Sequence, residues 1–98
     1  MLKKTLRSKV SGIVRETLRA QKGLLTEVSD MAGVNRKEFN RRNMDRMKLY
    51  KLVRVMYALC LVEPVLFAAM MDRIRDEVSA FVDEHEEDYF MDGCHERL

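Results

Sequence analysis

Basic and amide side chains gather in one short stretch of the chain. Residues 35–42 read Asn-Arg-Lys-Glu-Phe-Asn-Arg-Arg. Arginine can donate two hydrogen bonds to the edge of guanine, and asparagine pairs in the same bidentate way with adenine. At helical spacing, four of these side chains fall on one stripe that would fit a major groove: Arg36, Lys37, Asn40 and Arg41. The residue types therefore indicate the chemistry of nucleic-acid recognition.

Some of these residues also have a structural explanation. Asn35 followed three residues later by Glu38 is the pattern of a capping box, so a role for Asn35 as a helix cap alone stays open beside base contact. The arginines and the lysine are also compatible with ordinary solvated charges. Asn40 differs, because asparagine is unfavourable inside a helix. Its place in the expected helix therefore favours a function.

The sequence contains no pattern typical of an enzyme. A glycine-rich phosphate loop, a nucleophile elbow and an HExxH motif are all missing. Asp92, Cys94 and His95 lack the second pair of soft ligands that a closed zinc site needs. We therefore predict no enzyme activity, no cofactor, no metal and no small-molecule ligand.

Charge is divided unevenly along the chain. Residues 1–57 hold 15 Lys and Arg against 5 Asp and Glu, whereas residues 58–98 hold 3 against 11. A basic half of this strength attracts a polyanion, and the acidic half repels it. The sequence therefore predicts one half that binds and a second half with another task.

Helix-breaking residues are rare, with one proline and four glycines in 98 residues, which predicts an all-α fold of about five helices. The first apolar stripe covers residues 2–18 with spacings of three and four. Ser11 could cap a helix that starts at Gly12, so one long helix and an arm followed by a helix are both open. Gly23 is expected to end this element.

The next segment predicts two helices joined by a tight turn. A short apolar helix over residues 24–32 is followed by Gly33, and a capped helix begins after Asn35. Glycine at the turn permits the positive φ that a steep change of direction needs. Asp45 is expected to cap a fourth helix, whose apolar residues on several faces predict a central position.

Pro64 fits the first turn of a fifth helix, which is expected to reach about Phe90. An apolar seam with spacings of four and three follows this helix. Its members, predicted to form a dimer or partner interface, are Phe67, Met71, Ile74, Val78, Phe81 and His85. A seam that serves only the core of one chain is the alternative.

Several segments together resemble the phage-repressor family of helix-turn-helix proteins, the Cro and repressor (XRE) type. Residues 18–24 look like the end of the family's first helix, and residues 28–35 look like its "L-A-x-x-x-G-V-S" turn. Phe39-Asn40 falls where the family has "I-S" in its recognition helix. Residues 49–59 are similar to the fourth helix, so the resemblance covers roughly residues 13–62.

The resemblance implies a lambda-repressor-like core and assigns roles to individual residues. Base contacts are implied for Asn35, Arg36, Lys37, Asn40 and Arg41. Phosphate contacts are implied for Lys22, Thr26, Arg42 and Arg46. The phosphate contacts would position the domain, and the base contacts would specify the sequence.

The sequence thus predicts a DNA-binding core over residues 1–62 and a C-terminal helix with an acidic tail over residues 63–98, in one folding unit. The expected function is a transcription regulator that occupies an operator on double-stranded DNA as a homodimer. The expected location is cytoplasmic, with no membrane contact. The alternative is an antitoxin-like or adaptor-like interaction module that binds a partner through the long C-terminal helix.

Overall fold

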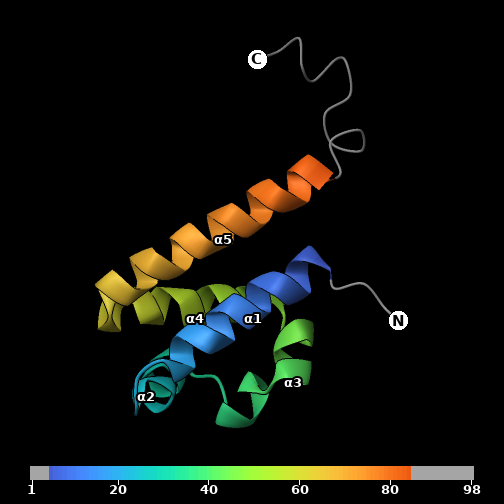
Figure 1. The fold of residues 1–98 in the computed structure, drawn as a ribbon. Coiled ribbons are helices and arrows are strands. Elements are labelled where there is room, and N and C mark those ends of the chain that lie inside the picture. Colours follow the sequence, from blue (N-terminus) through green and yellow to red (C-terminus); the bar gives the residue numbers. More distant parts are fainter. Residues whose placement is uncertain (1–4, 85–98) are drawn as a thin grey trace.

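A computed structural model describes residues 5–84, and within that range the chain is all-α (Figure 1). The elements are α1 (Leu6–Arg19), α2 (Leu24–Ala32), the 3-10 turn η1 (Arg36–Phe39), α3 (Arg41–Arg46), α4 (Leu49–Val62) and α5 (Pro64–Glu84). The predicted all-α fold of about five helices is confirmed.

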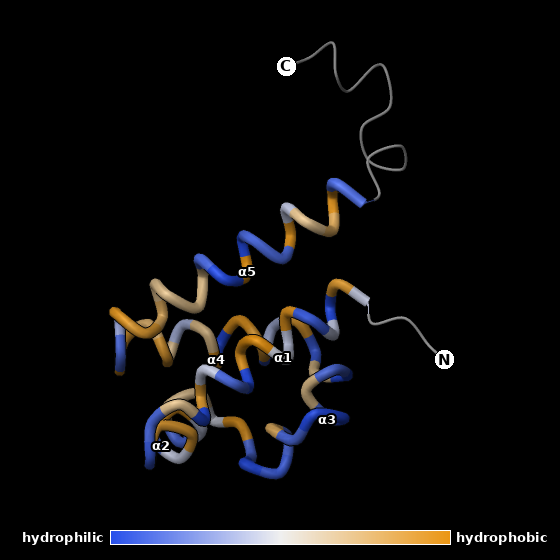
Figure 2. Tube along the Cα trace, viewed as in Figure 1, coloured by the Kyte–Doolittle hydropathy of each residue, from blue (hydrophilic) through white to orange (hydrophobic). Residues whose placement is uncertain are grey.

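The helices surround one apolar core. Helix α5 packs on α1 and α4, while α2 packs on α4 and α3 packs on α1 (Figure 1). The most deeply buried side chains come from every helix and include Leu18, Val28, Met44, Leu59 and Met70. The hydropathy trace shows apolar stretches along α1 and α4 and a hydrophilic stretch over η1 and α3 (Figure 2). The segment singled out by its residue types is therefore the most polar side of the fold.

Helix α1 is one continuous helix. Its N-terminus is capped by Thr5, whose hydroxyl accepts a hydrogen bond from the Ser8 amide at 3.1 Å. The helix passes through Gly12, so the alternative of a helix starting there is excluded. It ends at Arg19, and the prediction that Gly23 ends it was wrong. Gly23 has φ +84° and instead directly precedes α2.

The tight turn after α2 forms as predicted. Gly33 takes φ +66°, and its amide and that of Val34 both donate to the Ser29 carbonyl. The buried Ser29 hydroxyl donates in turn to the Val34 carbonyl at 2.7 Å. Ser29 therefore stabilises the turn through hydrogen bonds of both its backbone carbonyl and its side chain.

The predicted third helix is broken into two pieces. Residues 36–39 form a 3-10 turn, Asn40 is extended with ψ 161°, and α3 begins at Arg41. The Asn40 side chain causes the break, because its Oδ1 accepts a hydrogen bond from the Asn43 amide at 2.8 Å and caps α3. Asparagine competes in this way with the continuing helix.

The predicted cap of α4 was also wrong. Asp45 lies inside α3, where its carboxylate accepts a hydrogen bond from the Ser8 hydroxyl at 3.1 Å. The residue that precedes α4 is Lys48, which makes no side-chain cap.

Helix α4 is buried on one face only. Leu52, Val55 and Leu59 lie in the core, whereas Val53 and Tyr57 are more than half exposed. The expectation that α4 is central because it is apolar on several faces is therefore met only on the face of Leu52, Val55 and Leu59. The face of Val53 and Tyr57 is exposed.

Helix α5 begins at Pro64 as predicted and is described to Glu84. The expected continuation to about Phe90 lies outside the described residues. Met70 and Ile74 point into the core. No helix in the range 5–84 is long and apolar enough to span a membrane.

Substitution by alanine should change the free energy of unfolding in opposite directions at Gly12 of α1 and at Gly33 of the turn. Gly33→Ala forces a side chain into the left-handed region, and its Cβ would lie 3.0 Å from the Arg54 guanidinium. We expect a loss of about 1–2 kcal/mol in the free energy of unfolding, measured by urea denaturation. Gly12→Ala, with nothing within 4 Å of the new Cβ, should gain about 0.5–1 kcal/mol. Equal effects of the two substitutions would contradict the geometry of the turn.

Candidate nucleic-acid interface

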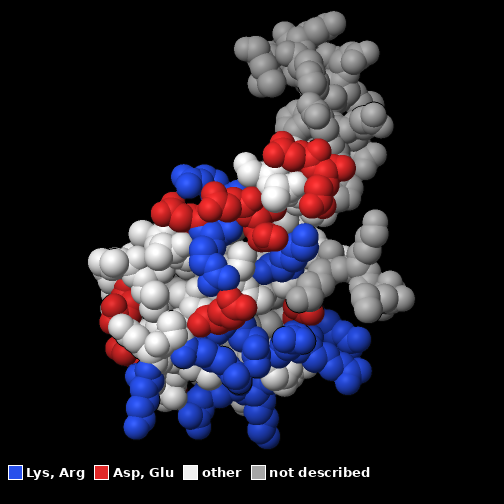
Figure 3. All heavy atoms as spheres, in the orientation of Figure 1, with Lys and Arg blue, Asp and Glu red and all other residues white. Residues whose placement is uncertain are grey.

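The two signs of charge occupy different parts of the surface. In Figure 3, Lys and Arg gather over the side formed by η1 and α3, and Asp and Glu gather along α5. We define the basic face by its exposed cations: Arg36, Lys37, Arg41, Arg42, Arg46 and Lys48. Only two acids, Glu38 and Asp45, occur between residues 35 and 48, and both are half-buried.

The predicted capping box positions the first two cations. The Asn35 side chain accepts from the Lys37 amide at 2.9 Å, and the Glu38 carboxylate accepts from the Asn35 amide at 3.3 Å. Phe39, at the end of η1, is buried in the core. This arrangement fixes the turn at both ends and leaves the side chains of Arg36 and Lys37 exposed.

Glu38 is also tied to α4. Its carboxylate accepts a hydrogen bond from the Lys51 ammonium at 2.9 Å. This hydrogen bond and the charge of Glu38 hold the pKa of Lys51 above its usual range, so that Lys51 stays charged. The pair attaches η1 to α4 and neutralises an acid beside the basic face.

The start of α2 meets the start of η1. The Arg36 guanidinium donates to the Thr26 hydroxyl at 3.2 Å, and both residues are exposed. The structure thus brings together a residue predicted to contact bases and one predicted to contact phosphate. Lys22, the other predicted contact in this region, is exposed in the segment between α1 and α2.

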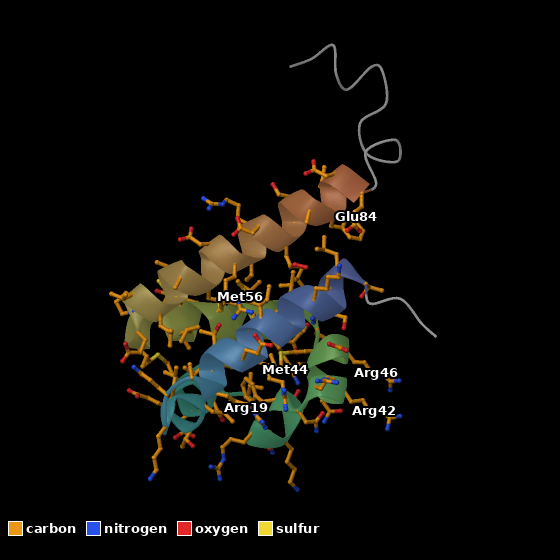
Figure 4. All side chains as sticks on the ribbon, in the orientation of Figure 1. Arg19, Arg42, Met44, Arg46, Met56 and Glu84 are labelled. Atoms are coloured by element: carbon orange, nitrogen blue, oxygen red, sulfur yellow. The ribbon has the colours of Figure 1, made fainter. Side chains whose placement is uncertain are left out.

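Helix α3 carries the remaining arginines. Arg42 and Arg46, one helical turn apart, project from α3 away from the other helices (Figure 4). Arg41 is exposed at the first position of α3. Arg42 and Arg46 extend the run of exposed cations from η1, whereas Arg41 lines a pocket with residues of α1 that include Glu16.

Asn40 has a structural role that sequence reasoning missed. Besides capping α3, its side-chain amide donates to the Lys37 carbonyl at 3.1 Å, and Asn43 donates to the same carbonyl at 3.0 Å. The argument that an unexplained mid-helix amide favours base contact therefore fails. Asn40 was also predicted to lie on one helical stripe with Arg36, Lys37 and Arg41. Residues 36–41 do not form one helix, so this stripe does not form.

Arg7 is a further residue whose role was not predicted. Its guanidinium donates to the carbonyls of Met44 and Met47 and to the Ser11 hydroxyl, which joins α1 to the C-terminal end of α3. The signal for this role in the sequence was the spacing of Arg7 and Ser11 by four residues, which places them on the same face of a helix. Arg7 is partly buried, so it positions the basic face and does not belong to it.

The predicted seam of α5 serves the core in part. Ile74 is buried, Phe67 and Phe81 are half-buried, and Met71 and Val78 are exposed. His85 lies outside the described residues. The assignment of this seam to a dimer interface stays a prediction.

Comparisons with known proteins return nothing: no family model matches the chain, and no curated protein or solved structure matches it. The resemblance to phage repressors is therefore a prediction from sequence motifs. Within residues 5–84, no three or more His, Cys, Asp or Glu side chains are grouped in a way that could hold a metal ion.

The cap of α3 can be tested by substitution. Asn40→Ala removes the acceptor of the Asn43 amide and should lower the free energy of unfolding by about 1 kcal/mol. Asn40→Ser keeps a capping oxygen and should lose only a few tenths of that. Thermal and urea unfolding measure both variants. If the alanine variant is as stable as the wild type, Asn40 does not hold the end of α3.

Proposed function

We propose that this chain is a sequence-specific, duplex-DNA-binding transcription regulator that occupies an operator as a homodimer. The observation that supports the proposal is the basic face, which places six exposed cations within residues 36–48 beside no exposed acid of that segment. Duplex DNA presents a negative charge about every 1.7 Å along its axis, and binding to it releases counterions.

The distribution of charge would orient the chain on DNA. The acidic residues of α5 lie on a different side of the fold from the basic face (Figure 3). Phosphates would attract one side and repel the other, so the approach of the basic face is favoured. Arg42, Arg46, Lys22 and Thr26 are the proposed phosphate contacts that set the register.

Base reading is proposed for Arg36, Lys37 and Arg41. All three side chains extend from backbone that is fixed by the capping box, by Phe39 and by the cap at Asn40. A fixed backbone is what allows a flexible side chain to reach a base edge in one geometry. Asn35 and Asn40 are assigned the supporting role, since their side chains make hydrogen bonds within the chain.

The proposed mechanism is occupancy. A two-fold dimer would present two basic faces to successive major grooves about 34 Å apart, so the operator would be an inverted repeat. A protein bound there near a promoter would block or recruit RNA polymerase.

Salt dependence tests the phosphate contacts. The double variant Arg42→Gln, Arg46→Gln should weaken binding to any duplex and flatten the plot of log K against log salt by about 0.9 for each lost contact. Fluorescence anisotropy with a labelled duplex measures both effects. The matched control is Arg73→Gln, Arg75→Gln, which makes the same charge change on α5 next to acids. Equal slopes for the two double variants would refute the basic face as the DNA surface.

Selection from a randomised duplex pool tests base reading. The wild type should enrich an inverted repeat with half-sites about one helical turn apart. Arg36→Ala and Arg41→Ala should each cost about 1–3 kcal/mol on the selected site and far less on random duplex. A folded wild type that enriches no sequence would overturn sequence-specific binding and favour the interaction-module alternative.

A further inference from the structure

Helix α4 displays an apolar face that nothing within the described chain covers. Four residues spaced by four form this face, which we call the α4 ridge: Leu49, Val53, Tyr57 and Leu61, exposed by 70%, 54%, 64% and 55%. Tyr50 on the same helix and Val65 at the start of α5 are exposed by 55% and 82%. Contiguous exposed apolar surface of this kind marks interaction sites.

The ridge carries no charge of its own. The charged residues of α4 are Lys51 and Arg54. Lys51 is bonded to Glu38 of η1, and the guanidinium of Arg54 lies against Gly33, 3.0 Å from the position that a Cβ there would take. Lys51 is thus paired, and Arg54 is exposed beside Gly33. The four ridge side chains are themselves uncharged, so two copies of the ridge could meet through apolar groups.

We propose that the α4 ridge is the surface through which two copies of this chain associate. Residues spaced by four form a ridge that packs into the corresponding groove of an identical helix, in the commonest class of helix packing, with a crossing angle of about −50°. Such a contact is self-complementary and compatible with a two-fold axis. The four ridge side chains, each more than half exposed, would contribute apolar area to the roughly 800 Å² per partner that a standard interface buries.

The position of the ridge suits the proposed function, on which this step rests. Leu49 follows directly after Lys48, the last cation of the basic face. When the two-fold axis bisects the crossing helices, both α4 N-termini lie at one end of the dimer. Both basic faces then lie at that end, as two half-sites of one operator require.

The seam of α5 offers less exposed apolar surface. Its most exposed members, Met71 and Val78, reach only 37% and 36%, and Ile74 is already in the core. Apolar area that is still in contact with water is what association can remove. The comparison favours the α4 ridge over α5 as the dimer surface.

Charged substitutions on α4 and on α5 test which of the two surfaces forms the dimer. Val53→Glu, Leu61→Glu places acids on the ridge, and Met71→Glu, Val78→Glu is the matched control on α5. Sedimentation velocity from low to high micromolar concentration should show a dimer for the wild type and the control. It should show a monomer, or an at least hundredfold weaker dimer, for the ridge variant. A monomeric wild type, or a ridge variant that dimerises while the α5 variant does not, would overturn the proposal.

A cross-linking test covers the case in which a charged variant fails to fold. In a background with Cys60→Ala and Cys94→Ala, Tyr57→Cys places one thiol on the exposed ridge, and Val78→Cys places one on α5. A short bis-maleimide should join two chains efficiently through position 57 and poorly through position 78. Efficient joining only through position 78 would assign the interface to α5 and refute the α4 ridge.

Measurements of DNA binding distinguish an error in the dimer surface from an error in the proposed function. On a duplex with one half-site, the ridge variant should keep salt-dependent binding and lose only the extra affinity for an inverted repeat. A wild type that dimerises through the ridge and ignores DNA would refute the proposed function alone. A monomeric wild type that binds one half-site would refute the ridge alone.

Discussion

The position of the basic face depends on the guanidinium of Arg7. Helix α3 has six residues, too few for a helix to be stable by itself in water. Arg7 donates hydrogen bonds to the carbonyls of Met44 and Met47 at the end of α3, where the Met44 carbonyl also accepts from the Met47 amide and the Ser11 hydroxyl. The fully buried Met44 side chain anchors the same helix in the core. Helix α3 carries half of the cations of the basic face. The hydrogen bonds of Arg7 in α1 therefore determine the position of a surface that is distant in the sequence.

Ion pairs neutralise two of the cations that a count along the chain assigns to binding. Lys51 is paired with Glu38, and Lys9 lies 3.8 Å from Glu77 of α5. Most of the exposed cations in the described part of the basic half lie within residues 36–48, while Arg19, Lys22 and Arg54 lie elsewhere. The Arg73–Glu16 pair between α1 and α5 is largely solvated and contributes little stability. The apolar contacts of Met70 and Ile74 are what hold α5 on the core.

Local signals in the sequence were sufficient for the turn and its surroundings. Gly33 takes positive φ, Asn35 and Glu38 form the capping box, and Pro64 opens α5, because each depends on a few neighbouring residues. The break at Asn40 could not be predicted in this way. An asparagine that caps a new helix and one that lies within a continuous helix have the same local sequence, and only the hydrogen bonds that the Asn40 side chain makes with residues 37 and 43 distinguish them. Periodicity likewise could not tell which apolar faces of α4 are covered, since burial depends on the packing of distant segments.

The junction of α3 and α4 connects the two proposed surfaces. The basic face ends at Lys48 and the α4 ridge begins at Leu49, while Met47, next to both, is buried. Because Met47 is buried in the core between them, the two surfaces share one support, and a contact on the ridge would affect the orientation of the basic face. Association would then preorganise two faces for one operator, and the operator would in turn favour association by the same free energy.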